Sequence, residues 1–139
     1  MSLLAVLPIA GSGMAAEAQR LSVVASNVAN ANSIAGPDGE PYRAREPVFA
    51  AIPLSGVAFG PAATGMAGVR VAGIVQSADP LHQSYDPSSP YADASGYVKS
   101  PNVDPVEEMV NMISAQQDYQ ADLEAFNVAK TLALRTLSL

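Results

Sequence analysis

Apolar residues recur with helical spacing at both ends of the chain. Near the amino terminus, from about Pro8 to Asn32, they lie three, four and seven residues apart, a spacing that places them on one face of a helix. After Asp104 a second, longer stripe continues to the end of the sequence. The two sets are Met14, Leu21, Val24, Val28 and Ala31, and Val106, Met109, Val110, Ile113, Leu123, Phe126, Leu134 and Leu137. We therefore predict one helix at each end.

The start of the carboxy-terminal helix is marked by the motif DPVE. Asp104 suits the N-cap, Pro105 suits the first helical position, and Glu107 occupies the third position. This pattern resembles a capping box with Asp in place of Ser or Thr. Acidic residues lead along the helix and basic residues follow, which is the order that the helix dipole favours. The motif predicts a helix that begins sharply after Asp104.

Between the helices, residues 34–103 hold nearly all of the proline and glycine. Two segments alternate with period two, YRAREPVFAAI (42–52) and GVRVAGIVQS (68–77), which is typical of a β-hairpin. The loop between them, residues 53–68, has no pattern. Residues 79–102 contain one turn signal after another, which indicates an extended arm rather than a regular element.

Together these elements predict an elongated α+β chain. The two long terminal helices, in residues 1–33 and 104–139, would pair as a coiled-coil-like inner domain. The β-hairpin and extended arm of residues 34–103 would be inserted between them. Both helices carry amide side chains on or beside the apolar stripe, and a buried amide is one way in which packed helices fix their register. The amides therefore indicate that the helices select a particular arrangement of partners.

Composition limits what such a chain can do. Apolar residues make up 49% of the 139 residues, but 25 of them are alanine and tryptophan is absent, so we expect only a thin core. The formal charge of −6, without a concentrated basic face, argues against nucleic acid and acidic membranes as partners. The lack of cysteine excludes disulfides and thiolate sites. No stretch approaches the roughly 20 apolar residues of a membrane-spanning helix.

The first residues, MSLLAVLPIAGSGMAAEA, imitate a secretory signal peptide, because a short apolar run is followed by small residues. However, no Lys or Arg precedes this run, the first basic residue is Arg20, and Pro8 interrupts the apolar stretch. We therefore expect that no signal peptide is cleaved.

Catalytic and metal-binding patterns are weak. His82 is the only histidine and lies in the turn-rich arm, where a solvated residue is expected. The aspartates at 79, 86, 93 and 104 are spaced too widely for a calcium loop and suit turns instead. The sequence lacks the phosphate-loop, dinucleotide-binding and zinc-protease motifs. We expect no enzyme activity, no metal and no cofactor.

Two segments resemble a known family. The segment IAGSGMAAEAQRLSVVASNVANANS ends in ASNVANA (25–31), which resembles the signature of the bacterial flagellar rod and hook family. The segment GYVKSPNVDPVEEMVNMISAQQDYQADLEAFNVAK (96–130) resembles the carboxy-terminal part of a proximal rod subunit of that family. Residues 68–103 fit the same subunit, including YDP at 85–87, whereas the loop 53–68 matches nothing.

The resemblance implies a structural subunit of the flagellar proximal rod. Such subunits polymerise through their terminal helices into the tubular drive shaft that transmits motor torque to the hook. The partners would be copies of the chain and other rod subunits. The flagellar type III export apparatus would deliver the chain to the periplasmic basal body without a cleaved signal peptide. Two alternatives are a helical coiled-coil adaptor and another rod subunit of the same family.

The resemblance also implies which residues contact neighbouring subunits. Asn27 lies too far inside the helix to cap it, which favours a contact role, whereas Asn30 and Asn32 suit either a cap or a contact. The candidate assembly residues are Leu21, Val24, Asn27, Val28, Asn30, Val106, Met109, Ile113, Gln116, Gln120, Leu123 and Asn127.

Overall fold

The computed structural model describes residues 3–34, 39–53 and 67–138 of the chain. It contains two long helices, α1 (Leu3–Asn30) and α2 (Pro105–Leu137), at the two ends of the sequence. Four strands lie between the helices: β1 (Arg45–Pro53), β2 (Ala67–Gln76), β3 (His82–Tyr85) and β4 (Tyr97–Ser100). The predicted α+β class is confirmed.

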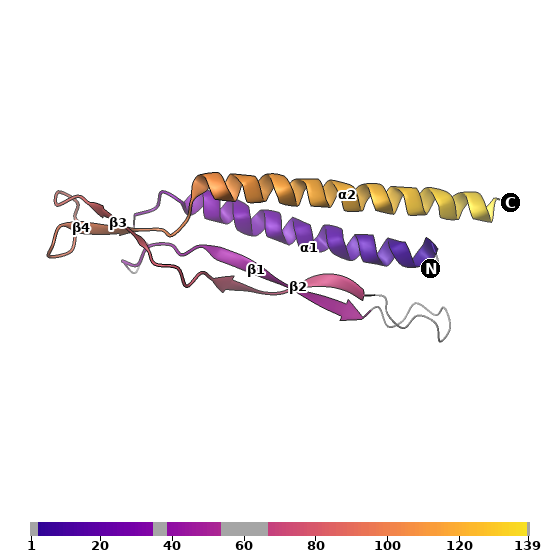
Figure 1. The fold of residues 1–139 in the computed structure, drawn as a ribbon, viewed down its shortest axis with the longest axis horizontal. Helices are drawn as coiled ribbons and strands as arrows, with labels where there is room; N and C mark the ends of the chain where they lie inside the picture. The colour runs from indigo at the N-terminus through magenta and orange to yellow at the C-terminus, as the bar shows by residue number, and fades with distance from the viewer. Residues whose placement is uncertain (1–2, 35–38, 54–66, 139) are drawn as a thin grey trace.

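The chain is elongated, and its elements form three layers (Figure 1). The two helices lie side by side and run antiparallel, so that both termini lie at one end of the molecule. The β1–β2 hairpin packs along the opposite side of α1, and the β3–β4 hairpin forms the far end. Among the described residues α2 contacts α1 but none of the strands. The amino-terminal helix is therefore the middle layer, covered on both sides by its own chain.

Helix α1 begins earlier than the sequence predicted. We expected it to start at about Pro8, but it starts at Leu3 and contains Pro8 in its second turn. Proline inside a helix removes one hydrogen bond, and glycine weakens a helix in water. Here tertiary contacts offset these effects, because Ala5 and Ala10 are buried and the Ser12 hydroxyl accepts a hydrogen bond from the Val69 N–H at 3.1 Å.

Helix α2 begins where the sequence predicted. The Asp104 carboxylate accepts hydrogen bonds from the backbone N–H groups of Val106, at 2.8 Å, and Glu107, at 3.4 Å, and Pro105 occupies the first turn. The N-cap assignment of Asp104 is confirmed. The second half of a capping box is missing, since no hydrogen bond joins the described Glu107 side chain to the Asp104 N–H. Glu107 instead contributes only its charge near the positive end of the helix dipole.

Strands β1 and β2 pair antiparallel from Arg45 opposite Gln76 to Pro53 opposite Ala67, with a bulge after Val48. The predicted hairpin is thus confirmed, although β1 begins three residues later than expected. The preceding residues are held by other groups: the Ala44 N–H donates to Asn102 Oδ1 at 2.8 Å. Most of the predicted loop, residues 54–66, lies outside the described part of the chain.

The turn-rich stretch is not a plain arm, because β3 and β4 pair antiparallel as a second hairpin. Tyr85 and Tyr97 face each other across it with ring centroids 5.4 Å apart. Gly96 has φ +80°, and a Cβ atom there would lie 2.9 Å from the Tyr85 ring. Asp93 accepts hydrogen bonds from the Tyr97 and Ser95 N–H groups, and these bonds lower its pKa. The short strands were missed because turn chemistry dominates their sequence.

The buried residues are mostly small, as the composition predicted. A cluster of Ala31, Ala44 and Val103, covered by Tyr42, lies where the end of α1, the start of the hairpin and the approach to α2 meet. His82 is exposed as expected, although it begins β3 rather than lying in a loop.

Candidate subunit interface

One stripe of α2 packs against α1. Its residues are buried or half-buried and alternate four and three residues apart, the spacing of a heptad repeat. Ala115, with no exposed area, and Ala129, with 3%, are its most buried members. We call this set the inner stripe: Glu108, Met112, Ala115, Tyr119, Asp122, Phe126, Ala129 and Ala133.

A second stripe of α2 has the same spacing and is exposed to solvent. Each of its residues directly follows a residue of the inner stripe in the sequence. Met109 is 53% exposed, Ile113 57% and Leu134 58%, which are high values for large apolar side chains. We call this set the outer stripe: Met109, Ile113, Gln116, Gln120, Leu123, Asn127, Lys130 and Leu134.

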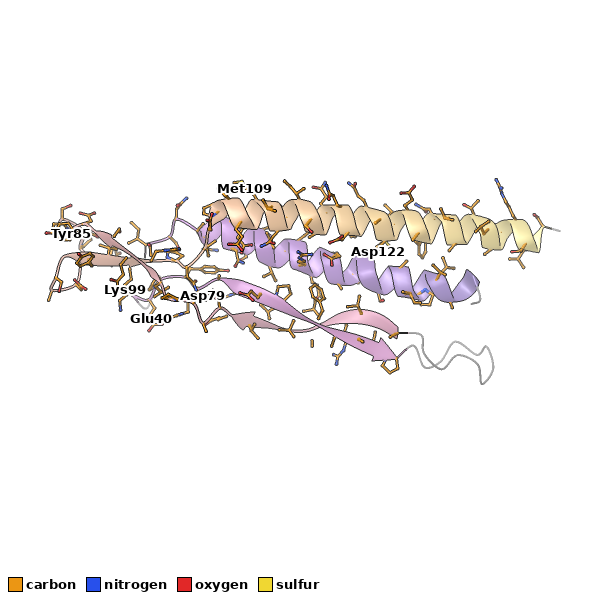
Figure 2. All side chains as sticks on the ribbon, viewed as in Figure 1. Glu40, Asp79, Tyr85, Lys99, Met109 and Asp122 are labelled. Carbon is orange, nitrogen blue, oxygen red and sulfur yellow. The ribbon has the colours of Figure 1, made fainter. Side chains whose placement is uncertain are left out.

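The outer stripe contains most of the assembly residues that the sequence indicated on this helix. Figure 2 shows Met109 on the side of α2 away from α1, whereas Asp122 of the inner stripe faces α1. Val106 extends the exposed stripe by one turn and is 70% exposed. The apolar stripe predicted from the sequence mixed the two faces, because it placed the half-buried Phe126 together with residues of the outer stripe.

The assembly residues expected on α1 lie mostly inside the chain. Val24 is 4% exposed and Asn27 1%, so neither presents a surface to a neighbour. Leu21, Val28 and Asn30 are half-buried. The interpretation of Asn27 as a subunit contact is therefore corrected: α1 is the middle layer, and its amide is used within the chain.

Asn27 joins three segments of the chain through four hydrogen bonds. Its Oδ1 accepts from the Arg45 N–H at 3.0 Å and from the Tyr42 hydroxyl at 2.9 Å. Its Nδ2 donates to the Arg45 carbonyl at 2.8 Å and to Glu108 Oε1 at 3.1 Å. A side-chain amide offers two donor hydrogens and two acceptor lone pairs, so this set uses its whole capacity. The end of α1, the start of β1 and the first turn of α2 are fixed to one side chain.

Asn30 acts within its own helix. Its Nδ2 donates to the Ser26 carbonyl at 2.8 Å, and its own carbonyl accepts from the Ser33 N–H at 3.1 Å. These bonds satisfy backbone groups in the last turn of α1, as expected of a residue at a helix end. The capping role is therefore the one that the geometry supports for Asn30.

Two carboxylates of the inner stripe lie in the contact between the helices. Glu108 Oε2 is buried and has no hydrogen-bond partner among the described residues, and burial raises the pKa of this carboxyl group. Burial also raises the pKa of Asp122, with a further contribution from Asp118. A Cβ atom added at Gly13 would lie 2.8 Å from the Asp122 Cγ, so a side chain at residue 13 would displace the Asp122 carboxylate.

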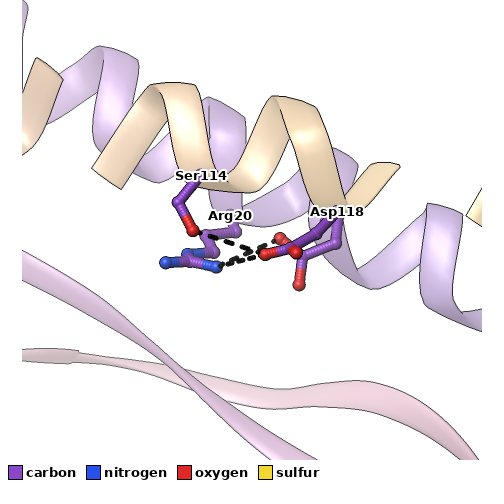
Figure 3. Close-up of polar contacts among 4 residues, drawn as sticks. Arg20, Ser114 and Asp118 are labelled. Carbon is purple, nitrogen blue, oxygen red and sulfur yellow. Dashed lines mark hydrogen bonds and ion pairs between the residues drawn. The ribbon is translucent and has the colours of Figure 1, made fainter. Parts of the chain in front are cut away.

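The remaining polar link between the helices is weaker. Arg20 lies 3.4 Å from a Glu17 carboxylate oxygen and 3.5 Å from an Asp118 oxygen, and the Ser114 hydroxyl lies 3.5 Å from the same Asp118 oxygen (Figure 3). Asp118 has 56% of its side chain exposed, and such long ion pairs near the surface contribute little stability.

No arrangement typical of a catalytic or metal site appears in the described residues. Within residues 3–34, 39–53 and 67–138, no three His, Asp or Glu side chains come together to hold a metal ion. Neither described helix combines the length and apolar character needed to cross a membrane. A shallow groove along the second half of α2 is instead lined by residues of the outer stripe and their neighbours, including Gln120, Leu123, Asn127, Val128 and Leu132.

Sequence reasoning missed the inner stripe. Its members Glu108 and Asp122 were not among the candidate assembly residues. The signal that would have found them is the regular alternation of four and three residues along α2. This spacing fits the inner stripe as well as it fits the more apolar outer stripe. The inner stripe was not recognised because the more apolar face of the helix was taken as the packing face.

Comparison with known proteins identifies the family. Residues 7–37 match the family described as flagella basal body rod protein, and residues 94–139 match the carboxy-terminal family of the flagellar basal body rod FlgEFG proteins. The chain is 50% identical to a FlgC flagellar basal-body rod protein of Salmonella typhimurium and 50% identical to one of Yersinia enterocolitica. It is 36% identical to the FlgC protein of Borreliella burgdorferi. Each comparison covers all of this chain and 98% of the relative. The chain therefore belongs to the FlgC family of flagellar basal-body rod proteins.

Proposed function

We propose that this structural subunit of the flagellar rod polymerises through its terminal helices, with the outer stripe of α2 packed against helices of neighbouring subunits. In this arrangement the subunit forms part of the proximal rod and transmits motor torque to the hook. Copies of the chain and other rod subunits are its partners. Its role is mechanical and needs neither catalysis nor a cofactor.

The exposed outer stripe is the observation that carries this proposal. Large apolar side chains stabilise a structure by about 1.5–3 kcal/mol each when they are fully buried. Met109, Ile113 and Leu134 are each more than half exposed in the single chain, so most of this free energy remains to be gained. The amides Gln116, Gln120 and Asn127 interrupt the apolar stripe, and amides of this kind restrict a helix to partners that can satisfy them.

The spacing of both stripes supports a coiled-coil-like packing. An alternation of four and three residues keeps a seam facing a partner helix over many turns. Two such stripes, about a quarter turn apart on α2, suit a helix with one neighbour in its own chain and another in the next subunit. The β1–β2 hairpin, which contacts α1 but not α2, would then lie outside the helical layer.

The amino terminus supports delivery without cleavage of a signal peptide. Ala5, Ala10 and Ala16 are among the buried residues of α1. Cleavage near Ala16 would remove about half of the helix that forms the middle layer. We infer that the chain keeps this segment, passes through the flagellar type III export apparatus and assembles in the periplasmic basal body.

Leu123→Asp tests the proposal. A charge on the outer stripe would have to lose its hydration without gaining a partner, so we expect loss of rod incorporation and of swimming, with secretion unchanged. Ala125→Asp is the matched control, because it adds the same charge to an exposed position of α2 outside both stripes. Normal swimming of the Leu123→Asp strain would contradict the assignment. Loss of swimming in both strains would mean that the contact extends beyond the outer stripe.

A further inference from the structure

We propose that the second half of β2, residues 73–76, pairs in the assembled rod with an extended segment of a neighbouring rod subunit. We call the unpaired side of these residues the open edge. The partner segment would add a third strand to the β1–β2 hairpin. The inference rests on the proposed function as a rod subunit and adds a contact outside the helical layer.

The hairpin turns over along its length, so that each strand faces α1 with only one half of its outer edge. Near one end, the Arg45 N–H and carbonyl of β1 bond to the Asn27 side chain at 3.0 and 2.8 Å. Near the other end, the Val69 N–H of β2 donates to the Ser12 hydroxyl at 3.1 Å. The two strands cross between these points (Figure 1). The side of the hairpin away from α1 therefore carries the second half of each strand.

The pairing register shows which backbone groups point outward on that side. In an antiparallel pair, the N–H and carbonyl of every second residue point away from the partner strand. Arg45 and Val69 fix this alternation on the two sides of the bulge, because their N–H groups bond to α1. Ile74 and Gln76 of β2 thus point outward, and none of the described residues bonds to their backbone on this side. The corresponding residues of β1 are Pro47, Phe49, Ala51 and Pro53.

The two strands differ in how their outer edges are protected. Proline has no N–H to offer a further strand, and natural proteins use it to block the edges of sheets. Two of the four outward residues of β1 are proline, whereas residues 73–76 of β2 contain neither proline nor a charged residue. All four of these β2 residues are exposed, Ile74 by 55% and Val75 by 48%. An exposed, uncharged and β-branched edge is the kind to which another strand adds.

The backbone groups of the open edge determine the kind of partner. Ile74 and Gln76 each present a donor and an acceptor, and two residues of a strand are about 7 Å apart. Another extended backbone has its groups at this spacing, whereas a helix satisfies its own groups except at its ends. The partner is therefore a segment from between the terminal helices of the neighbour. Apolar or β-branched side chains on this segment would pair with Ile74 and Val75.

Hydrogen exchange in purified basal bodies tests the pairing in the assembled state. The Ile74 and Gln76 N–H groups should exchange at least about tenfold more slowly than those of Phe49 and Ala51, which lie on the blocked edge. Rapid exchange at all four residues would overturn the proposal. Slow exchange at all four would also overturn it, because the neighbour would then cover both edges.

A proline on each edge tests whether the contact is needed for assembly. Ile74→Pro removes an outward N–H that β1 does not use, so we expect several-fold less of the chain in rods and weaker swimming. Ala51→Pro is the matched control, because it removes an outward N–H from the edge that is already blocked. Ile74→Ala keeps the N–H and should have a smaller effect than Ile74→Pro. Normal incorporation of Ile74→Pro, or an equal loss in both proline variants, would overturn the assignment.

Photo-crosslinking identifies the partner. The photoreactive amino acid p-benzoylphenylalanine at Gln76, in assembled rods, should attach to the middle segment of a rod subunit, as mass spectrometry of the product can show. Arg70 is the control position, since it is exposed on the other half of β2 and should not give this product. Attachment of the Gln76 probe to a terminal helix, or to a basal-body protein outside the rod, would overturn the proposal.

The failure of this inference can be distinguished from that of the proposed function, because the two contacts lie on different elements. If Leu123→Asp blocks incorporation while Ile74→Pro does not, the helical contact stands and the strand pairing is rejected. If Leu123→Asp swims normally while the Gln76 probe attaches as expected, the strand pairing stands and the role of the outer stripe is rejected.

Discussion

The two helices have the same repeat but differ in what covers them. Helix α1 lies between α2 and the β1–β2 hairpin, and small residues such as Ala16, 3% exposed, fill its contacts. Helix α2 has its own chain on one side only, and its larger residues remain outside, with Val106 70% exposed. Whether a residue of this subunit is buried therefore depends on the layer in which it lies more than on its hydrophobicity. In a subunit of an assembly, the most apolar stripe can be the one left for a neighbour.

The largest effect that would test this comparison is expected at the buried end of α1. Asn27→Ala would leave the Arg45 backbone groups, the Tyr42 hydroxyl and Glu108 without their partner. Each buried group left unpaired costs about 1–3 kcal/mol, so we expect a loss of about 3 kcal/mol or more in the free energy of unfolding, measured by urea titration. Asn32→Ala, at an exposed position, should change it by less than about 0.5 kcal/mol. Similar losses in both variants would show that α1 is not held by this amide.

A smaller effect is expected at the start of α2. Asp104→Ala should reduce the stability of this helix by about 0.5–2 kcal/mol, because two backbone N–H groups lose their acceptor. Glu107→Ala is the control and should have less effect, since its carboxylate makes no hydrogen bond to the cap. Circular dichroism during urea titration measures both variants. An equal loss from the two would mean that charge near the helix dipole, and not the cap, fixes the start of α2.

The smallest effects are the pH dependences of local stability at the start of α2 and at the β3–β4 turn. We expect the two dependences to have opposite signs. Burial raises the pKa of Glu108 from its ordinary value of 4.5, so its protonated form favours the helix contact. This contribution is complete below about pH 4.5 and is lost as the pH rises through the pKa in the folded chain. Hydrogen bonds lower the pKa of Asp93 from 3.8, so its contribution to the β3–β4 turn is present above that value and is lost on further acidification.

Backbone amide hydrogen exchange at several pH values can follow the start of α2 and the β3–β4 turn separately. The rates must first be corrected for the intrinsic dependence of exchange on pH. We expect protection near Glu108 to weaken above about pH 4.5, and protection near Asp93 to weaken below about pH 3.8. Glu108→Gln should remove the first dependence and leave the second. The same dependence at both ends would contradict these assignments.

Local chemistry allowed part of the fold to be predicted from the sequence. Asp104 and Pro105 fixed the start of α2 because a helix N-terminus depends on a few neighbouring residues. The alternation of apolar and polar residues around Val48 and Val71 indicated the first hairpin, because this pattern also depends only on neighbouring residues. The second hairpin was missed because turn residues dominate the sequence of its short strands, and its pairing depends on Gly96, which has a positive φ and lies against the Tyr85 ring.

The candidate interface was harder to predict because it depends on the order of the layers. The sequence pattern identified Met109 and Leu123 as apolar positions, and only the resemblance to the rod family assigned them to contacts with neighbouring subunits. It also indicated Asn27 as a contact residue without showing that Arg45 and Glu108 of the same chain are its partners. Periodicity shows that a helix has a buried face, and only the tertiary arrangement shows which partner buries it.

The antiparallel pairing of the chain ends has a consequence for the rate of folding. The contact between Asn27 and Glu108 spans 81 residues, and that between Arg20 and Asp118 spans 98, whereas Asn27 reaches Arg45 across only 18. Contacts between distant residues form slowly, because the chain between them must first be brought into a loop. During synthesis from the amino terminus, α1 can dock on the hairpin early, but α2 can join it only after the last residues have been made. The helix that carries the outer stripe is therefore the last to enter the fold.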